Sequence, residues 1–234
     1  MRWLVLSVTS AVLASSVLSV AQARSKGPAR FFPDPSSIFA ADIAFSRMAR
    51  EQGQWTAFRK TAADDAVIAV QRPELAANWL KGKQDPPQAV KWQAHRAYVS
   101  CDGRLGATTG AWQGPDGAQG YFTTVWRRDK KGEWKWVFDH WDRLMTPRDS
   151  VEALEGHVAN CKNLPGRRGP GADIMPSPDD RKSSKDHKAE APPLDESLRW
   201  SYDIGTDGSR HVRISLWNGS GYDMVIEDKV GAVR

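Results

Sequence analysis

Residues 119–142 read QGYFTTVWRRDKKGEWKWVFDHWD and contain two β-rich runs joined by a short turn. The runs, at residues 119–127 and 133–142, are rich in aromatic and β-branched side chains, which favour strands. The sequence between them, Asp129-Lys130-Lys131-Gly132, is a Gly/Asp-containing turn of the kind that joins antiparallel strands. This stretch therefore predicts an antiparallel hairpin at the centre of the fold.

A larger sheet extends outward from this hairpin. Two further β-rich runs precede it at residues 92–100 and 104–112, and short turns that contain Gly and Asp occupy residues 101–103 and 114–117. Four runs with such short connections are typical of an antiparallel meander.

Helical periodicity precedes the sheet. Apolar residues recur every three or four positions between Ile38 and Ala49, after a possible capping serine at position 36 or 37, and Gly53 is placed to end that helix. A shorter helix is expected at residues 55–62, a β-rich run at 67–70 and a third helix after Pro73. Helices followed by a sheet predict an α+β fold in which the helices cover one face of the sheet.

The main domain is expected to span residues 36–161, after a polar, Pro-containing lead-in at residues 24–35. Asp149 and Glu152 form a possible capping box, which predicts a short trailing helix that ends near Cys161.

Two segments follow the main domain. Residues 162–196 contain six Pro and no aromatic residue, a composition that cannot bury enough apolar surface and so predicts a flexible linker. Residues 197–234 return to strand-like runs, which predict a three-stranded β-meander at residues 198–204, 211–217 and 222–227.

The first 23 residues predict export. Arg2 precedes an uncharged run from Leu4 to Val20, and Ala21-Gln22-Ala23 fits the cleavage site of a signal peptide. The alternative is an uncleaved membrane anchor, for which the run is short and rich in serine. We expect a periplasmic or secreted protein with no membrane attachment after cleavage. Because export leads to an oxidising compartment, the two cysteines, Cys101 and Cys161, are expected to form a structural disulfide rather than a nucleophilic thiol.

Composition limits the classes of function. The formal charge is +5, from 33 Lys and Arg against 28 Asp and Glu, with no concentrated basic stripe of the kind that nucleic-acid-binding proteins carry. Two cysteines are too few for a cysteine-only zinc cluster, and His95 and His140 lack the usual ligand spacing. The sequence contains neither a Gly-rich phosphate loop nor a G-x-S-x-G nucleophile elbow. We therefore expect no nucleic-acid partner, no metal and no cofactor.

The order of these elements resembles the nuclear transport factor 2-like superfamily over about residues 36–146, and most nearly exported SnoaL-like proteins of bacteria, a branch classed as a domain of unknown function. The resemblance is carried by apolar and aromatic patterns at residues 44–45, 53–58, 62–67, 92, 100–103, 109–112, 120–126 and 132–140. It implies a cone-shaped, curved antiparallel sheet wrapped around N-terminal helices, with a pocket inside. Members of the superfamily include isomerases, cyclases, dehydratases and non-catalytic binding domains, and they are often dimeric, so the fold alone does not choose a function.

Alternation along the predicted strands places aromatic side chains on one face. If no bulge intervenes, Trp136, Phe138 and His140 share an inward face, and Lys135 marks the other face as outward. Such aromatic faces with a few polar groups are typical of small-molecule pockets. We therefore predict a site for a small hydrophobic or aromatic ligand, lined by Trp92, Arg96, Tyr98, Phe122, Trp126, Trp136 and His140.

Two structural alternatives stay open for these residues. The aromatic side chains are also consistent with an ordinary core, and Arg96 with an ion pair rather than a clamp for an anionic ligand. The outward face keeps Val137 and Trp141, and we expect either a homodimer contact or the C-terminal meander to cover it.

His140, Asp142 and Tyr98 are the candidates for catalysis. Histidine titrates near neutral pH, and a carboxylate two residues along the same strand face could orient it. Asp139 points to the opposite side of the strand, so it cannot pair directly with His140. The isomerases of the superfamily combine an acidic base with a Tyr donor, a pattern that Asp142 and Tyr98 could supply.

Three functions follow from the sequence. The first is an exported small-molecule-binding or accessory protein without an assignable reaction. The second is an isomerase or lyase that acts on a hydrophobic substrate through His140 and Asp142. The third is a protein-interaction module whose meander pairs with the sheet edge of another chain.

Overall fold

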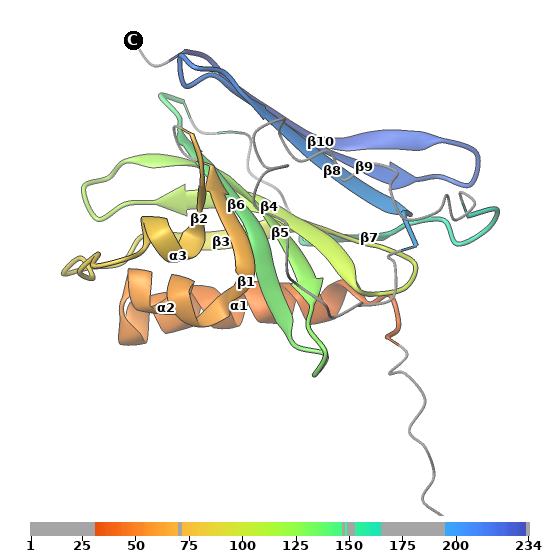
Figure 1. The fold of residues 1–234 in the computed structure, drawn as a ribbon, viewed down its shortest axis with the longest axis horizontal. Helices are drawn as coiled ribbons and strands as arrows, with labels where there is room; N and C mark the ends of the chain where they lie inside the picture. The colour runs from red at the N-terminus through yellow and green to blue at the C-terminus, as the bar shows by residue number, and fades with distance from the viewer. Residues whose placement is uncertain (1–30, 70–71, 147, 149–152, 165–194, 233–234) are drawn as a thin grey trace, which may run out of the picture.

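The computed structural model describes residues 31–69, 72–146, 148, 153–164 and 195–232. It has the expected α+β architecture, in which helices, a seven-stranded sheet and a three-stranded sheet form successive layers (Figure 1). The signal-peptide segment, the central part of the predicted linker, and Asp149 and Glu152 lie outside the described residues. Within the described ranges, no helix combines the length and apolar character needed to cross a membrane.

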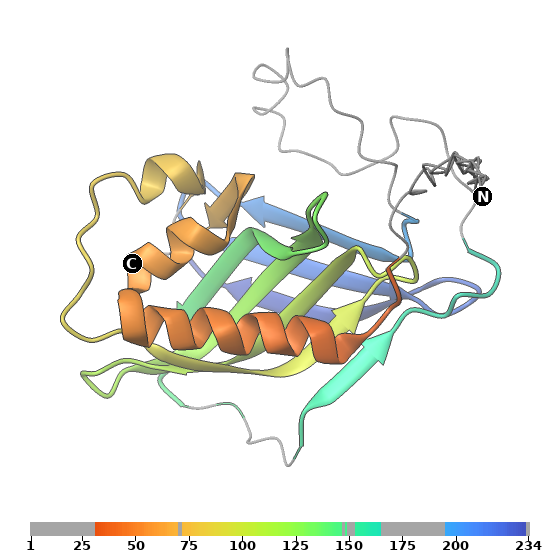
Figure 2. The same ribbon diagram turned by 90° about the horizontal axis from the view of Figure 1, so that it is seen from below.

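The two N-terminal helices are α1 (Pro35–Gln52) and α2 (Gln54–Thr61). The cap of α1 is Asp34, whose carboxylate accepts a hydrogen bond from the backbone N–H of Ser36 at 2.9 Å, and not a serine as expected. Gly53 separates the helices with a φ of 106°, a conformation that favours glycine. α1 lies across the strands of the large sheet (Figure 2), so its apolar side chains are buried against one sheet face.

The large sheet consists of β1 (Ala62–Ala69), β2 (Pro73–Leu75), β3 (Lys91–Val99), β4 (Leu105–Gln113), β5 (Gln119–Arg128), β6 (Trp134–Arg143) and β7 (Glu155–Val158). Its strand order is β2-β1-β6-β5-β4-β3-β7. Its four central strands are antiparallel, as predicted, whereas β1 is parallel to β6 and β7 is parallel to β3, so the sheet as a whole is mixed. A single helical turn, α3 (Ala76–Trp79), follows β2, because Pro73 enters the sheet instead of starting the helix.

The prediction of a trailing helix is wrong in the part that the structure describes. Glu155–Val158 forms β7, and the N–H of Ala159 continues the pairing with the carbonyl of Val99 at 3.0 Å. The edge of β3 otherwise exposes unpaired backbone groups, and pairing with it outweighs the local helix signal. The chain then reaches Cys161, which is disulfide-bonded to Cys101 across a Cα–Cα distance of 5.5 Å.

Two β-bulges decide which side chains face the helices. In β3, Ala94 pairs with Gly110 and Arg96 pairs with Thr109, so His95 is an extra residue. In β6, the extra residue is Val137, because the neighbouring tryptophan and phenylalanine pair with consecutive residues of β5. Each extra residue shifts the two-residue alternation of the strand by one position. Each side chain after a bulge therefore points to the face opposite to the one that it would occupy in a regular strand.

A three-stranded antiparallel meander covers the face of the large sheet opposite the helices (Figures 1 and 2). It consists of β8 (Leu198–Ile204), β9 (Arg210–Trp217) and β10 (Tyr222–Val230), close to the predicted runs. Phe138 of β6 is fully buried here and packs against Trp200 and Tyr202 of β8, with ring centroids 5.1 and 5.0 Å apart. The sequence predicts either a homodimer contact or the C-terminal meander over this face, and the structure has the meander there.

Candidate functional site

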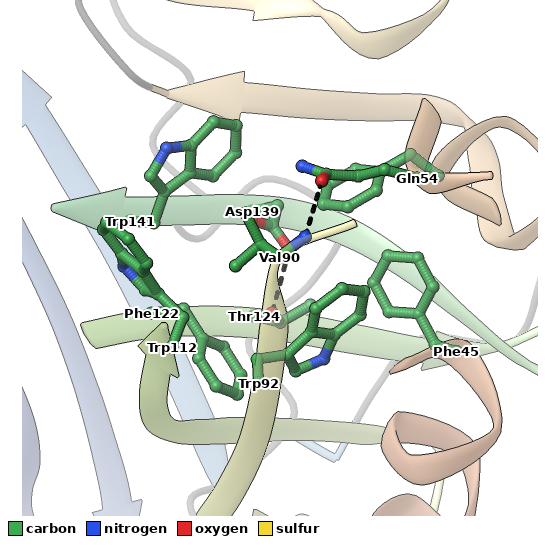
Figure 3. Close-up of a pocket in the computed structure, with 10 residues that line it drawn as sticks. Phe45, Gln54, Val90, Trp92, Trp112, Phe122, Thr124, Asp139 and Trp141 are labelled. Carbon is green, nitrogen blue, oxygen red and sulfur yellow. Dashed lines mark hydrogen bonds between the residues drawn. The ribbon is translucent and has the colours of Figure 1, made fainter. Parts of the chain in front are cut away.

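A pocket of about 90 Å³ lies between the helices and the concave face of the large sheet (Figure 3). Pockets that enclose drug-sized ligands are typically about 300–1,000 Å³, so this one has room for a single small ring. Its floor is formed by buried residues, namely Phe45, Gln54, Phe58, Phe122, Thr124 and Asp139. Half-buried residues form its rim, namely Val90, Trp92, Trp112 and Trp141.

The aromatic walls are held by edge-to-face packing. The ring of Phe45 is 4.8 Å from the rings of both Phe58 and Trp92, and Phe58 is 6.2 Å from Trp141, between ring centroids. Such contacts add to the stabilisation from burial and fix the ring orientations. The pocket therefore has a preformed apolar wall built from α1, α2, β3 and β6.

Hydrogen bonds fix two further lining residues. Gln54 Oε1 accepts from the backbone N–H of Val90 at 3.0 Å, which ties α2 to the segment that enters β3 (Figure 3). Trp112 Nε1–H donates to the carbonyls of Tyr121 and Asp142 at 3.0 and 3.1 Å. Because this N–H is already engaged with the backbone, Trp112 offers its ring to the pocket.

Asp139 and Thr124 form the polar part of the floor. Thr124 Oγ1 donates to Asp139 Oδ2 at 2.9 Å, and Asp139 is only 3% exposed (Figure 3). Burial raises the pKa of Asp139 well above its usual range, the negative charge of Asp42 raises it further, and the hydrogen bond from Thr124 opposes the change. The environment thus favours the uncharged carboxylic acid, which can donate a hydrogen bond as well as accept one.

A second carboxyl, Asp42 of α1, is buried on the same side of the sheet but does not line the pocket. Its Oδ2 accepts from Thr108 Oγ1 at 3.1 Å, and Thr108 in turn accepts from Trp126 Nε1–H at 2.9 Å. Burial raises the pKa of Asp42 to about 7, although the hydrogen bond from Thr108 lowers it. Burial therefore raises the pKa of two carboxyls on this side of the sheet.

Four predicted ligand-binding residues lie on the concave side as expected. Trp92 and Phe122 line the pocket, whereas Trp126 and Trp136 are 1% and 0% exposed and belong to the core below it. The core alternative therefore holds for Trp126 and Trp136.

The inward placement predicted for the other three, Arg96, Tyr98 and His140, is wrong. The bulges at residues 95 and 137 turn these side chains to the opposite face. Arg96 forms an exposed ion pair with Glu155 at 2.8 Å, the structural alternative weighed from the sequence.

The catalytic candidates do not converge. Tyr98 lies on β3 and His140 on β6, and β4 and β5 separate these strands. The ring of Tyr98 stacks on His157 with centroids 5.1 Å apart, and His140 Nδ1 is 3.2 Å from the carbonyl of Ala69. Asp142 pairs with Arg210 at 3.3 Å. Within the part of the chain that the structure describes, no group of three or more His, Cys, Asp or Glu side chains is placed to hold a metal ion.

Sequence reasoning missed most of the polar floor and part of the rim. It assigned Asp139 and Trp141 to the outward face because the bulge at Val137 has no marker in the sequence. The one available signal is compositional, since Asp139 is an acidic residue inside the aromatic run WVFDHW. Phe45 and Phe58 lie within the two helices that the sequence predicts, but only the tertiary arrangement brings their side chains to the pocket.

No protein-family model matches the sequence, and no curated protein matches it. Among solved structures, it is similar to a proposed ketosteroid isomerase from Parabacteroides distasonis, with 16% identity and a TM-score of 0.37 over 44% of this chain and 86% of that one. A ketosteroid isomerase-like protein from Erwinia carotovora atroseptica is 20% identical, with a TM-score of 0.37 over 50% of this chain and 100% of that one. A proposed aromatic ring hydroxylase from Novosphingobium aromaticivorans is 19% identical, with a TM-score of 0.35 over 48% of this chain and 90% of that one.

At these identities and TM-scores, neither an activity nor a site residue is transferred to this chain. The chemistry of the pocket therefore follows from its own residues.

Proposed function

We propose that this domain binds a small, uncharged, apolar molecule in the concave pocket, with Asp139 as its polar contact. The observation that carries the proposal is a carboxyl at the floor of an aromatic cavity, with one oxygen occupied by the hydroxyl of Thr124. The other oxygen is left for a ligand. Apolar walls with a few placed polar groups are typical of small-molecule sites.

The pocket also restricts the class of ligand. Its volume of about 90 Å³ suits one small ring, and an uncharged carboxyl donates a hydrogen bond to an acceptor oxygen such as a carbonyl. A small cyclic ketone meets both requirements, so we use cyclohexanone as the probe.

We also propose that the protein is exported to the periplasm or the medium, because residues 1–23 have the pattern of a signal peptide. The N-terminal sequence of the native protein should then begin at Arg24.

A second candidate function is proton transfer to the bound molecule. The raised pKa of Asp139, caused first by burial, brings a carboxyl toward the range in which general acids and bases work. In this role the ionised fraction of Asp139 would take a proton from the carbon next to a bound carbonyl, which leaves an enolate and the neutral acid, and the acid would then return a proton to that carbon. This candidate replaces the pair His140 and Asp142, because their side chains lie on the other face of the sheet.

Two substitutions at Asp139 separate these functions. Asp139→Leu removes the hydrogen bond and should weaken cyclohexanone binding about tenfold, the equivalent of about 1.4 kcal/mol. Asp139→Asn keeps a donor and should retain binding, but it cannot exchange a proton. Binding is measured by NMR titration of the tryptophan indole signals, and exchange by deuterium incorporation into cyclohexanone in D₂O.

Asp64→Asn, at an exposed carboxylate of β1, is the matched control and should leave both measurements unchanged. Absence of saturable cyclohexanone binding to the wild-type protein, or equal binding by Asp139→Leu, would falsify the binding proposal. Binding without deuterium incorporation would remove the proton-transfer candidate alone.

A further inference from the structure

Side chains along β5 and β6 point alternately to the pocket and to the C-terminal meander, and both sides contain polar groups. On the concave side, β5 contributes Phe122 and Thr124, and β6 contributes Asp139 and Trp141. The residues between them point to the other face and meet the C-terminal meander. These residues are Tyr121, Thr123, His140 and Asp142.

Asp228 of β10 holds β5 from the meander side. It is 1% exposed, and its Oδ2 accepts a hydrogen bond from Thr123 Oγ1 at 2.6 Å. Its other oxygen is 3.0 Å from Arg148 Nη2. Thr123 directly precedes Thr124, the residue that donates to Asp139 in the pocket. A single peptide unit therefore links the meander carboxylate to the polar floor.

Arg210 of β9 holds β6 in the same way. Its side chain is 4% exposed, and Nη2 is 3.3 Å from Asp142 Oδ1. The backbone carbonyl of Asp142 accepts from the indole N–H of Trp112, which forms part of the pocket rim. The charged side chain of Arg210 is therefore connected to the pocket rim through a single residue, Asp142.

Docking alone does not account for these buried charges. The apolar side chains of the meander, including Ile214 and Leu198, already pack on the main sheet. In each pair one ion is buried and its partner is partly exposed. Such a pair is often no more stabilising than apolar residues of the same size, because the buried ion loses its hydration. Arg210 Nε is also buried with no hydrogen-bond partner among the described residues, which adds to the cost.

We propose that Asp228 and Arg210 are positioning residues through which the meander sets the places of Thr124, Asp139 and Trp112 in the pocket. For its effect on ligand binding, this inference rests on the proposed function. The coupling is reciprocal, so a molecule bound in the pocket also stabilises the docked meander.

The test compares substitutions within the meander interface. Asp228→Leu should weaken cyclohexanone binding about tenfold, within the usual range of coupling between two sites. Asp228→Asn still accepts from Thr123 and should change binding less than about threefold on the same scale. Ile214→Val perturbs the same interface without touching the polar contacts and is the matched control. Thr123→Val removes the same hydrogen bond from the side of the main sheet, and it is used if Asp228→Leu does not fold.

Two readouts keep the inference separate from the proposed function. In the ligand-free protein, the amide signal of Thr124 should move in Asp228→Leu, and the indole N–H signal of Trp112 should move in Arg210→Met, but neither should move in Ile214→Val. Where Thr123→Val replaces Asp228→Leu, the side-chain carboxyl carbon signal of Asp139 is read instead of the Thr124 amide. If the wild-type protein does not bind cyclohexanone, the proposed function fails, and these signals still decide the inference. Unmoved signals, or equal shifts in Ile214→Val, overturn the positioning role. So does unchanged binding in a wild-type protein that takes the probe.

Discussion

The concave and convex faces of the large sheet use the same strands for opposite purposes. On the concave face, Asp139 is paired with a neutral hydroxyl and borders a cavity. On the convex face, Asp142 and Asp228 are paired with Arg210 and Arg148 beneath a second sheet. Acidic residues three positions apart on one strand therefore differ in what they can do. A carboxyl paired with a cation contributes to structure, whereas one with a free oxygen in an apolar cavity is available to a ligand.

The largest difference between the faces is expected from removing an aromatic ring on each. Phe138→Ala should cost about 3–5 kcal/mol of unfolding free energy, because the ring is fully buried between the two sheets. Phe122→Ala should cost less, about 2 kcal/mol, because its ring borders an existing cavity, but it should reduce cyclohexanone binding. Urea unfolding followed by circular dichroism measures both losses. Equal costs would show that the pocket is an ordinary filled core.

Asp42 provides a pH-dependent difference between the faces. Between the unfolded-state pKa near 3.8 and about 7, the folded protein keeps a proton on Asp42 that the unfolded chain has lost. The free energy of unfolding therefore falls as pH rises through this window, and the contribution of this group is on the order of 4 kcal/mol. Asp42→Asn carries no titrating proton, so it should show a smaller decline between pH 4 and pH 8.

Urea unfolding midpoints measured at half-unit pH steps test this prediction. Asp64→Asn is the control, and it should reproduce the wild-type pH profile. A profile for Asp42→Asn that is parallel to the wild type would contradict a buried, protonated Asp42.

The smallest effect is expected from Arg96→Ala on the convex side. The guanidinium is exposed and pairs only with the exposed Glu155 among the described residues, a type of ion pair worth about 0–1 kcal/mol. Cyclohexanone binding should be unchanged, because the bulge at His95 turns the side chain away from the pocket. A clear loss of binding in NMR titrations would place Arg96 in the site and reverse the face assignment.

Local signals in the sequence were sufficient for most of the fold. Gly- and Asp-containing turns mark the ends of β3 to β6 and of the meander strands, and Gly53 marks the break between α1 and α2. These features are predictable because the turn residues act through their own backbone conformations. β7 was missed, since its strand form depends on pairing with the distant edge of β3.

The site was less predictable than the fold. Trp92 and Phe122 were placed correctly because each lies in a stretch of strand without a preceding bulge. Arg96, His140 and Asp139 were placed on the wrong faces, since one extra residue reverses every side chain that follows it. Nothing local distinguishes Val137 as that residue; the partner strand β5 decides it.

The most direct test of the account is an NMR titration of the Asp139 side-chain carboxyl carbon, with and without cyclohexanone. We predict a pKa well above the usual range for aspartate, caused by burial, and a change in the carbon signal when cyclohexanone binds. A pKa in the ordinary range near 3.9, together with a signal that cyclohexanone does not move, would contradict the assignment of Asp139 to a ligand pocket.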